Sequence, residues 1–239
     1  ERRKGRQYST QIIFDDYEDD DAYNSSIEDY VYIGSHKVYY KYSSRGKLVV
    51  INQGLNRSGF SLCNTCGYII PLVEHKKKKA DRHKDRYGRW CENTYLHMVH
   101  LGYDFITDVL ELRLPPLAGS DNSLLYSLLY ALLEGASMSL GIDRSEINGS
   151  LYYDSSGVGF TPRLIFFDEV PGGAGHVKKI SQHIDDVVRS AHRKVSGICG
   201  CGEETSCYGC LRNYGNQLYH DILSRGSAMK YLDYIMRDV

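Results

Sequence analysis

Four of the seven cysteines of this chain lie within twelve residues, in the stretch CGCGEETSCYGC that runs from Cys199 to Cys210. This stretch is polar and has little apolar surface with which to fold on its own. Its thiols form two close pairs, with Cys201 and Cys207 as the inner members, and the intervening glycines permit the sharp turns that bring both pairs to one ion. The spacing predicts a structural zinc site with four cysteine ligands; disulfides and free thiols are the alternatives.

A second group of thiols lies upstream, where CNTCG places Cys63 and Cys66 in a short knuckle and Cys91 follows. No further cysteine remains, so a fourth zinc ligand must be a histidine. His83 is favoured because HKDRYGRWC brings it and Cys91 together across a turn at Gly88. The alternative is an incomplete site in which Cys91 is a small buried hydrophobe. The local candidates for the fourth ligand are His75, His83, His97 and His100.

Four protein ligands would close each zinc site, because no position stays open for water or substrate. We therefore predict two structural zinc ions and no catalytic residue in this chain. A catalytic DNA-processing domain with its site near the PGGAG turn is the alternative from another class, and a pure protein-interaction platform is a third.

Composition limits the classes of partner. The formal net charge of the 239 residues is -1, so the chain as a whole lacks the basic bias of a dedicated nucleic-acid binder. No apolar run approaches the length of a membrane helix, and the N-terminus ERRKGRQYST has no apolar signal core. We expect a cytoplasmic protein without membrane or small-molecule partners. Because the chain begins at Glu1 without a methionine, we also expect it to be a piece of a longer protein.

The pattern along the chain predicts an α+β fold: a mixed sheet with flanking helices, pinned by two zinc knuckles. YDFITDVLELRL, EINGSLYYD and PRLIFFDEV have the character of strands, and SDNSLLYSLLYALLEGASMSLGI that of a buried helix. The segment 171–195 opens with glycines and is expected to continue as an amphipathic helix, and two short helices are expected after Cys210. The expected segments are a mobile acidic linker (1–29), a β-strand segment (30–56), the first zinc knuckle with a basic loop (57–100) and the α+β domain (101–239).

Three segments carry the resemblance to a known family: HLGYDFITDVLELRL, FFDEVPGGAGHVKK and CGCGEETSCYGCLRNYGNQLYHDILSR. Together and in this order they are similar to the MrfA-type zinc-binding domain, which lies at the C-terminal end of superfamily 2 helicases of bacterial DNA repair and phage defence. The domain also occurs in helicase-partner proteins of defence systems such as DISARM. The resemblance covers about residues 55 to 239.

The resemblance implies specific zinc ligands. The four cysteines of the family correspond to Cys199, Cys201, Cys207 and Cys210, and the pattern C-x2-C…H…C of members with an upstream site corresponds to Cys63, Cys66, His83 and Cys91.

The sequence lacks the motor of such a helicase. It contains no G-x4-G-K-[ST] phosphate loop and no DEAH-like box, so Asp168 and Glu169 in FFDEVPGG do not make an ATPase. We expect this chain alone to be no enzyme. It would be an accessory piece that scaffolds protein partners or contacts DNA for a helicase motor in cis or in trans.

Three segments are candidates for contact with DNA or phosphate, each with a structural alternative. The basic stretch HKKKKADRHKDRYGR would contact a DNA backbone or remain a solvated loop. The PGGAG turn would bind a phosphate or serve as a tight turn. LRNYGNQ would contact a single strand or hydrogen-bond the zinc loop, which we favour. The candidate residues are Lys76, Lys77, Lys78, Lys79, Arg82, Arg86, Gly172, Gly173, Arg212, Asn216 and Gln217.

Overall fold

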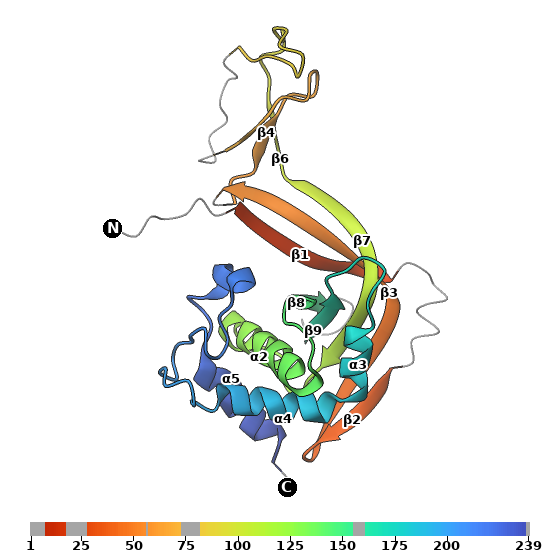
Figure 1. The fold of residues 1–239 in the computed structure, drawn as a ribbon, viewed down its shortest axis with the longest axis vertical. Coiled ribbons are helices and arrows are strands. Elements are labelled where there is room, and N and C mark those ends of the chain that lie inside the picture. Colours follow the sequence, from red (N-terminus) through yellow and green to blue (C-terminus); the bar gives the residue numbers. More distant parts are fainter. Residues whose placement is uncertain (1–7, 18–27, 56, 73–81, 155–160, 238–239) are drawn as a thin grey trace. The chain divides into compact units, whose positions relative to one another are not determined.

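The computed structural model describes residues 8–17, 28–55, 57–72, 82–154 and 161–237 (Figure 1). The chain divides into two compact units. The knuckle unit consists of Glu1–Ile13 and Val49–Asp104, and the core unit consists of Phe14–Leu48 and Phe105–Val239. Three strands continue from one unit into the other: β1 (Tyr8–Tyr17), β3 (His36–Leu55) and β7 (Leu101–Arg113).

The larger sheet has the strand order β1-β3-β7-β9-β8, with β2 paired to β3. β9 is an interior strand and apolar on both faces, and its residues from Leu164 to Phe167 are fully buried. β9 lies antiparallel to both neighbours, with Phe167 opposite Val109 on β7 and opposite Asn148 on β8. The further strands are β2 (Asp29–Ile33), β8 (Ile147–Asp154) and β9 (Thr161–Asp168).

The helices of the core unit share one hydrophobic cluster with this sheet. α2 packs directly on α4, and Gly135 makes this close approach possible: a Cβ there would lie 2.4 Å from the carbonyl oxygen of Val187. Leu129 of α2 reaches the sheet at Gly149 of β8. The helices are α2 (Asn122–Leu140), α3 (His176–Gln182), α4 (Ile184–Val195), the 3-10 helix η1 (Tyr214–Tyr219) and α5 (Arg225–Ile235).

α2 has a capping residue at each end. Asp121 caps its N-terminus by accepting a hydrogen bond from the Leu124 amide, and Gly141 ends it in the left-handed conformation. By length and composition this 19-residue helix would be able to span a membrane, so the expectation that no apolar run has that length is wrong. Much of the helix is buried inside the core unit, where it is the central core helix.

The knuckle unit holds a second, smaller sheet with the order β5-β4-β6. β4 (Phe60–Leu62) pairs antiparallel with β5 (Ile69–Pro71) and with β6 (His97–Val99). Such short strands bury little surface. Both zinc-ligand candidates at the start of this segment, Cys63 and Cys66, lie in the turn that joins β4 to β5.

The α+β class expected from the sequence is confirmed, and every pairing whose register is described is antiparallel. Two local expectations differ. Residues 8–17, assigned to an acidic linker, form β1, because YSTQIIF precedes the acidic run and pairs with β3. The helix expected after the glycines of 171–195 is two helices, since the backbone leaves the helical region at His183 (φ -135°, ψ 35°). The rest of the acidic run, 18–27, lies outside the described residues. The expected segment boundaries stay a prediction.

Candidate metal centres

The C-terminal cluster gathers four sulfur atoms from two turns. The Sγ atoms of Cys199, Cys201, Cys207 and Cys210 all lie within 4.8 Å of one another. Neighbouring sulfurs are 3.5 Å apart for Cys199 and Cys201, and 3.8 Å apart for Cys201 and Cys210 and for Cys207 and Cys210. With Zn–S bonds of about 2.3 Å, the edge between two sulfurs of a tetrahedron is about 3.8 Å. The sulfurs are therefore spaced for one zinc ion and too far apart for disulfides, whose S–S bond is about 2.05 Å.

The backbone around this cluster is shaped to admit the metal ligands. The carbonyl oxygen of Cys207 accepts hydrogen bonds from the amides of Cys210, Leu211 and Arg212. These bonds close a tight turn, the knuckle. Gly209 has no side chain because a Cβ would lie 3.0 Å from the Cβ of Cys199. A side chain at this position would therefore require Cys199 to shift.

Hydrogen bonds and apolar packing attach the C-terminal cluster to the core unit. Arg225, at the start of α5, donates to the carbonyl oxygen of Cys201 (3.0 Å) and to that of Val195 (2.9 Å). Cys210 is 1% exposed, and it and the other three cysteines pack against the main hydrophobic cluster. The role of Arg225 was missed in the sequence, since nothing local connects it with a cysteine 24 positions earlier.

The segment after the last cysteine hydrogen-bonds the zinc loop, which is the alternative that the sequence favoured. Asn216 is 1% exposed and donates to the carbonyl oxygen of Leu211 (2.8 Å). Arg212 donates through Nε to the hydroxyl of Ser206 (3.0 Å) and through Nη2 to the carbonyl oxygen of His220 (3.1 Å). The buried amide of Asn216 has no access to a nucleic acid in this fold, and Gln217 is half-buried beside it.

The upstream cluster combines three thiols with one imidazole. Cys63, Cys66, His83 and Cys91 present ligand atoms that all lie within 4.8 Å of one another. The Nε2 atom of His83 is 3.2 Å from the sulfur of Cys66, and the sulfurs of Cys63 and Cys91 are 3.9 Å apart. The structure therefore brings together the four residues that the sequence favoured.

Neighbouring side chains orient this cluster. The ring of Tyr68 stacks on that of His83, with centroids 4.7 Å apart. Asn93 donates one amide hydrogen towards the sulfur of Cys63 (3.6 Å) and one to the hydroxyl of Thr65 (3.0 Å). Gly67 adopts a positive φ of 75°, which lets its amide return to the carbonyl oxygen of Cys63 (2.8 Å). Neither Tyr68 nor Asn93 was singled out in the sequence.

One thiol in each cluster has a lowered pKa. At Cys63 burial opposes ionisation, but hydrogen bonds from the amides of Cys66 and Thr65 outweigh it and lower the pKa to about 6. At Cys199 the hydrogen bond from the amide of Cys201 is the largest cause, and the pKa falls to about 7. Burial raises the pKa of Cys210 to about 12. A metal ion that takes thiolates would therefore find part of each donor set ionised near neutral pH.

The other histidines take no part in these clusters. His97 and His100 are exposed and lie outside the group of four, and His75 lies outside the described residues. In the described part of the chain, groups of three or more potential metal ligands occur at these two cysteine clusters.

The PGGAG turn has no free backbone amide for a phosphate. The amide of Gly172 donates to the carbonyl oxygen of Ile106 (2.7 Å), and that of Gly173 to the carbonyl oxygen of Val170 (3.0 Å). Both glycines have positive φ, as a tight turn requires. These bonds favour the structural alternative at Gly172 and Gly173.

Two buried carboxylates accept hydrogen bonds from the remaining amides of the turn. Asp168 is fully buried and Asp108 nearly so, and their negative charges at the start of α3 disfavour a bound phosphate. The same hydrogen bonds argue against a catalytic centre at this turn, because both candidate acids, Asp108 and Asp168, are engaged by backbone amides before and at the start of α3. Asp168 accepts from the amides of Ala174, His176 and Val177 at 2.7, 3.1 and 3.0 Å, and Asp108 accepts from that of Gly175 at 3.0 Å.

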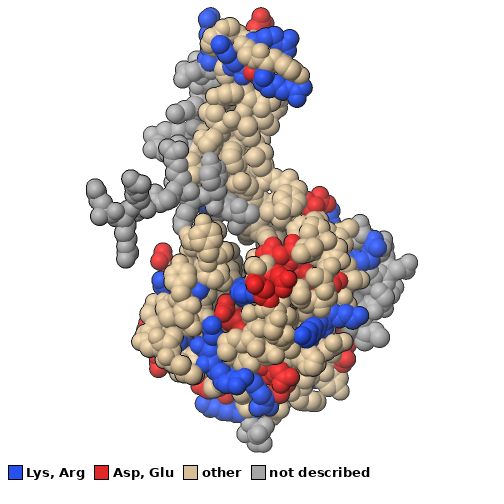
Figure 2. Space-filling view, viewed as in Figure 1, with Lys and Arg blue, Asp and Glu red and all other residues tan. Residues whose placement is uncertain are grey.

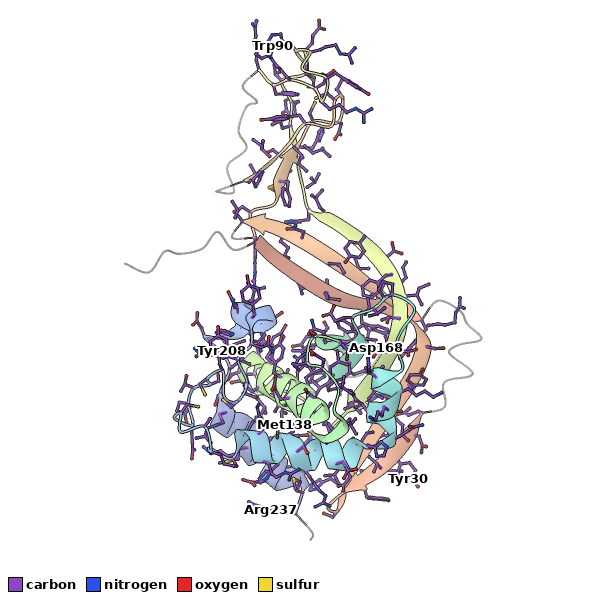
Figure 3. All side chains as sticks on the ribbon, viewed as in Figure 1. Tyr30, Trp90, Met138, Asp168, Tyr208 and Arg237 are labelled. Atoms are coloured by element: carbon purple, nitrogen blue, oxygen red, sulfur yellow. The ribbon has the colours of Figure 1, made fainter. Side chains whose placement is uncertain are left out.

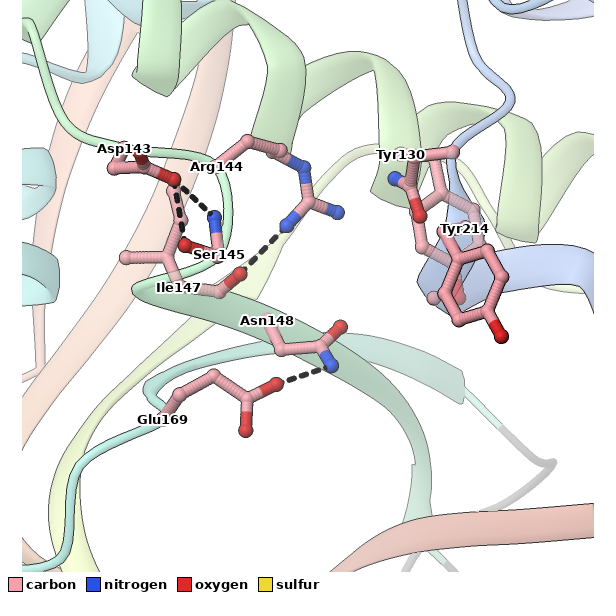
Figure 4. Close-up of a pocket in the computed structure, with 10 residues that line it drawn as sticks. Tyr130, Asp143, Arg144, Ser145, Ile147, Asn148, Glu169 and Tyr214 are labelled. Carbon is pink, nitrogen blue, oxygen red and sulfur yellow. Dashed lines mark hydrogen bonds between the residues drawn. The ribbon is translucent and has the colours of Figure 1, made fainter.

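A cavity of about 480 Å³ opens in the core unit beside Tyr130 and Tyr214 (Figure 4). Its charged groups are paired with neighbours. Asp143 accepts from the amide and hydroxyl of Ser145, and Glu169 accepts from the side chain of Asn148 (2.6 Å). This arrangement gives no support to a catalytic DNA-processing site here.

The candidate DNA contacts of the basic stretch are only partly described. Lys76 to Lys79 lie outside the described residues, whereas Arg82 and Arg86 are exposed. Arg86 donates to the hydroxyl of Tyr87 and lies over that ring.

Comparisons with known proteins find similarity to a zinc-binding family over part of the core unit. Residues 128–211 match the family model of the MrfA Zn-binding domain. Over 234 residues the chain is 28% identical to Druantia protein DruE of Escherichia coli (strain UMEA 4076-1). That match covers 85% of this chain but 12% of DruE, so the chain spans a small part of that relative's length.

Solved structures of the helicase MrfA are also similar. MrfA bound to DNA gives a TM-score of 0.46 at 14% identity, covering 95% of this chain and 25% of that one. A second MrfA structure gives 0.43 at 13% identity, covering 96% and 24%. The matched residues 128–211 contain all four cysteines of the C-terminal cluster. The MrfA Zn-binding domain model therefore matches the part of the chain that holds this cluster.

Proposed function

We propose that this chain is a zinc-stabilised accessory module of a superfamily 2 DNA helicase system, acting in DNA repair or anti-phage defence. It scaffolds protein partners or contacts DNA for a motor located in cis or in trans, and it hydrolyses no ATP itself. Support comes from the family match over residues 128–211 and from the likeness to Druantia protein DruE.

The observation that carries the proposal is the closed geometry of the C-terminal cluster. Its four sulfurs lie within 4.8 Å of one another, inside the region matched by the zinc-binding family. One Zn²⁺ bound to all four has no open position, so it fixes the loop and performs no chemistry on a substrate. We assign a second structural zinc to Cys63, Cys66, His83 and Cys91, which is closed in the same way.

Metal content tests the two sites separately. Elemental analysis is expected to find two zinc ions per chain, and one each in Cys210→Ser and Cys63→Ser. Met138→Ser, at an exposed position of α2, is a matched control that is expected to keep both. Absence of metal from the chain purified without chelator would contradict the scaffold model.

Activity assays test the alternative classes. We expect no ATP hydrolysis and no nuclease activity with Mg²⁺ or Mn²⁺ at any pH between 6 and 9. Cleavage of DNA that is lost on removing one described residue would favour the catalytic alternative. A salt-dependent shift of labelled DNA that is lost when Lys76 to Lys79 become Glu separates DNA contact from a pure protein-interaction platform.

A further inference from the structure

The upstream metal cluster holds a hairpin by both of its ends. His83 and Cys91 are ligand candidates, and the seven residues between them, 84–90, form the segment that we call the hairpin tip. Its ends are joined by the hydrogen bond from the Cys91 amide to the His83 carbonyl oxygen (3.0 Å) and by a bridge between Lys84 and Trp90. A metal ion at this cluster would therefore fix where the hairpin tip begins and ends.

The turn inside the hairpin tip is fixed by one carboxylate. Asp85 accepts hydrogen bonds from the amides of Tyr87 and Arg89, each at 2.9 Å, and from Nε of Arg89 at 2.9 Å. The Gly88 amide donates to the Asp85 carbonyl oxygen, with φ at 81°. The only acidic residue of the hairpin tip thus serves the turn and forms an ion pair with Arg89. The other two cations of the hairpin tip, Lys84 and Arg86, are exposed, and so is the Arg89 side chain.

Large aromatic rings are exposed on the same segment. Tyr87 is 66% and Trp90 63% exposed, and Trp90 is the only tryptophan of the chain. Lys84 lies 4.8 Å from the centre of the Trp90 ring, and the guanidinium groups of Arg86 and Arg89 lie 4.7 and 5.3 Å from that of Tyr87. Figure 2 shows Lys and Arg side chains gathered at the end of the knuckle unit where Figure 3 labels Trp90.

Exposed aromatic rings beside cations favour a ligand that has both planar groups able to stack and negative charges. Unpaired bases stack on aromatic rings, and each stacked base contributes about 1–3 kcal/mol. The phosphates between the bases attract Lys and Arg side chains. A duplex keeps its bases stacked inside and presents mainly phosphates to a protein surface, so the exposed rings would contribute little to binding it.

We propose that the hairpin tip binds single-stranded DNA by stacking unpaired bases on Tyr87 and Trp90 while Lys84, Arg86 and Arg89 contact the adjoining phosphates. This deepens the DNA contact of the proposed function, on which it rests, by naming the form of DNA and the side chains that recognise it.

The single tryptophan gives a direct readout. The zinc-loaded chain is titrated with unlabelled oligo(dT) of about 12 nucleotides, a length within the usual site size of single-strand binders. A base stacked on Trp90 is expected to quench the tryptophan fluorescence, whereas a duplex of the same length leaves it nearly unchanged. Quenching is expected to persist in Tyr214→Ala, which removes an exposed tyrosine of the core unit.

Affinity measurements separate stacking from charge. In anisotropy titrations with labelled oligo(dT), Trp90→Ala and Tyr87→Ala are each expected to weaken binding about tenfold, the equivalent of about 1.4 kcal/mol per ring. Trp90→Phe is expected to restore most of the affinity. Replacing Lys84, Arg86 and Arg89 together by Ala is expected to weaken binding to both single strand and duplex and to flatten the salt dependence.

The outcomes decide between this inference and the broader proposal. If zinc is bound and DNA binds equally to the wild type and to both ring variants, the inference is overturned while the proposed function stands. If a synthetic acidic peptide with the sequence of residues 15–29 quenches Trp90 and oligo(dT) does not, the hairpin tip is a protein-binding surface and the inference is again overturned. If no zinc is bound, the proposed function itself is wrong.

Discussion

The two cysteine clusters differ in what surrounds them. The C-terminal cluster packs against a large hydrophobic core built from the sheet, α2, α4 and α5, and Cys210 is part of that core. The upstream cluster lies in the small sheet of three-residue strands β4, β5 and β6, where Phe60 and Leu72 are among the few buried apolar side chains. In the core unit a metal ion would secure one loop of a domain that is already packed. In the knuckle unit a metal ion would supply the folding free energy that a hydrophobic core supplies in a larger domain.

The largest expected effect is therefore the loss of the upstream metal. Cys63→Ser removes a fully buried ligand, and zinc binding contributes about 10 kcal/mol or more to the folding of small zinc modules. Amide hydrogen exchange is expected to lose protection over 57–72 and 82–100. Protection in α2 and α4 is expected to remain.

The corresponding substitution in the C-terminal cluster tests whether the core unit depends less on its metal than the knuckle unit does. Cys210→Ser is expected to lose protection around 199–212 while the sheet and α2 stay protected, since their packing does not depend on the metal. Loss of protection throughout the core unit, with an intact knuckle unit, would show that we have assigned the two roles the wrong way round.

A smaller effect is expected at the buried cap of α3. Asp168→Asn replaces a carboxylate oxygen that accepts amide hydrogens by an NH₂ group that faces them. Hydrogen bonds to a charged group contribute about 1.5–3 kcal/mol each, so we expect a loss of about 3 kcal/mol in the free energy of unfolding. Asp143→Asn, at an exposed turn, is the control and should cost under about 1 kcal/mol. Denaturant titration measures both, and equal losses would contradict the capping role.

A still smaller effect is expected behind the C-terminal cluster. Asn216→Ala leaves the carbonyl oxygen of Leu211 without its donor inside the protein, at a cost of about 1–3 kcal/mol. The neighbouring exposed Tyr214→Ala should change stability by under about 0.5 kcal/mol. If Asn216 instead contacts DNA, its replacement would weaken DNA binding and leave thermal stability unchanged.

The smallest expected difference lies in the pH at which the clusters lose their ionised thiols. The pKa values of Cys199 and Cys63 are lowered from 9.0 to about 7 and about 6. Each ionised thiol therefore stabilises the folded form fully above pH 9, and this contribution is lost as the pH falls through about 7 for Cys199 and about 6 for Cys63. Zinc release, followed with a chromophoric chelator, should begin at higher pH in Cys63→Ser, which keeps the C-terminal site. Cys210→Ser, which keeps the upstream site, should release it at lower pH.

Much of the fold was predictable because its signals are local. α2 has an Asp cap, a nearly continuous apolar face and a terminal glycine, all within one stretch of sequence. The strand character of β7, β8 and β9 was equally plain. β1 was missed because the acidic residues after it dominate the composition of 1–29. The break at His183 was missed because ISQHIDDVV keeps a helical pattern across it.

By itself, the sequence determined which thiols belong together, because ligands a few residues apart can reach one ion only through the turns that the glycines permit. The tertiary structure decided what each segment does beyond that. Within PGGAG, the amides of Ala174 and Gly175 donate to Asp168 and Asp108, which come from two strands far apart in the sequence. The fold also places Arg225 against the carbonyl oxygen of Cys201. It also left Trp90 and Tyr87 exposed on a hairpin held by two ligand candidates. Exposure and hydrogen-bond partners depend on distant residues, and no local pattern records them.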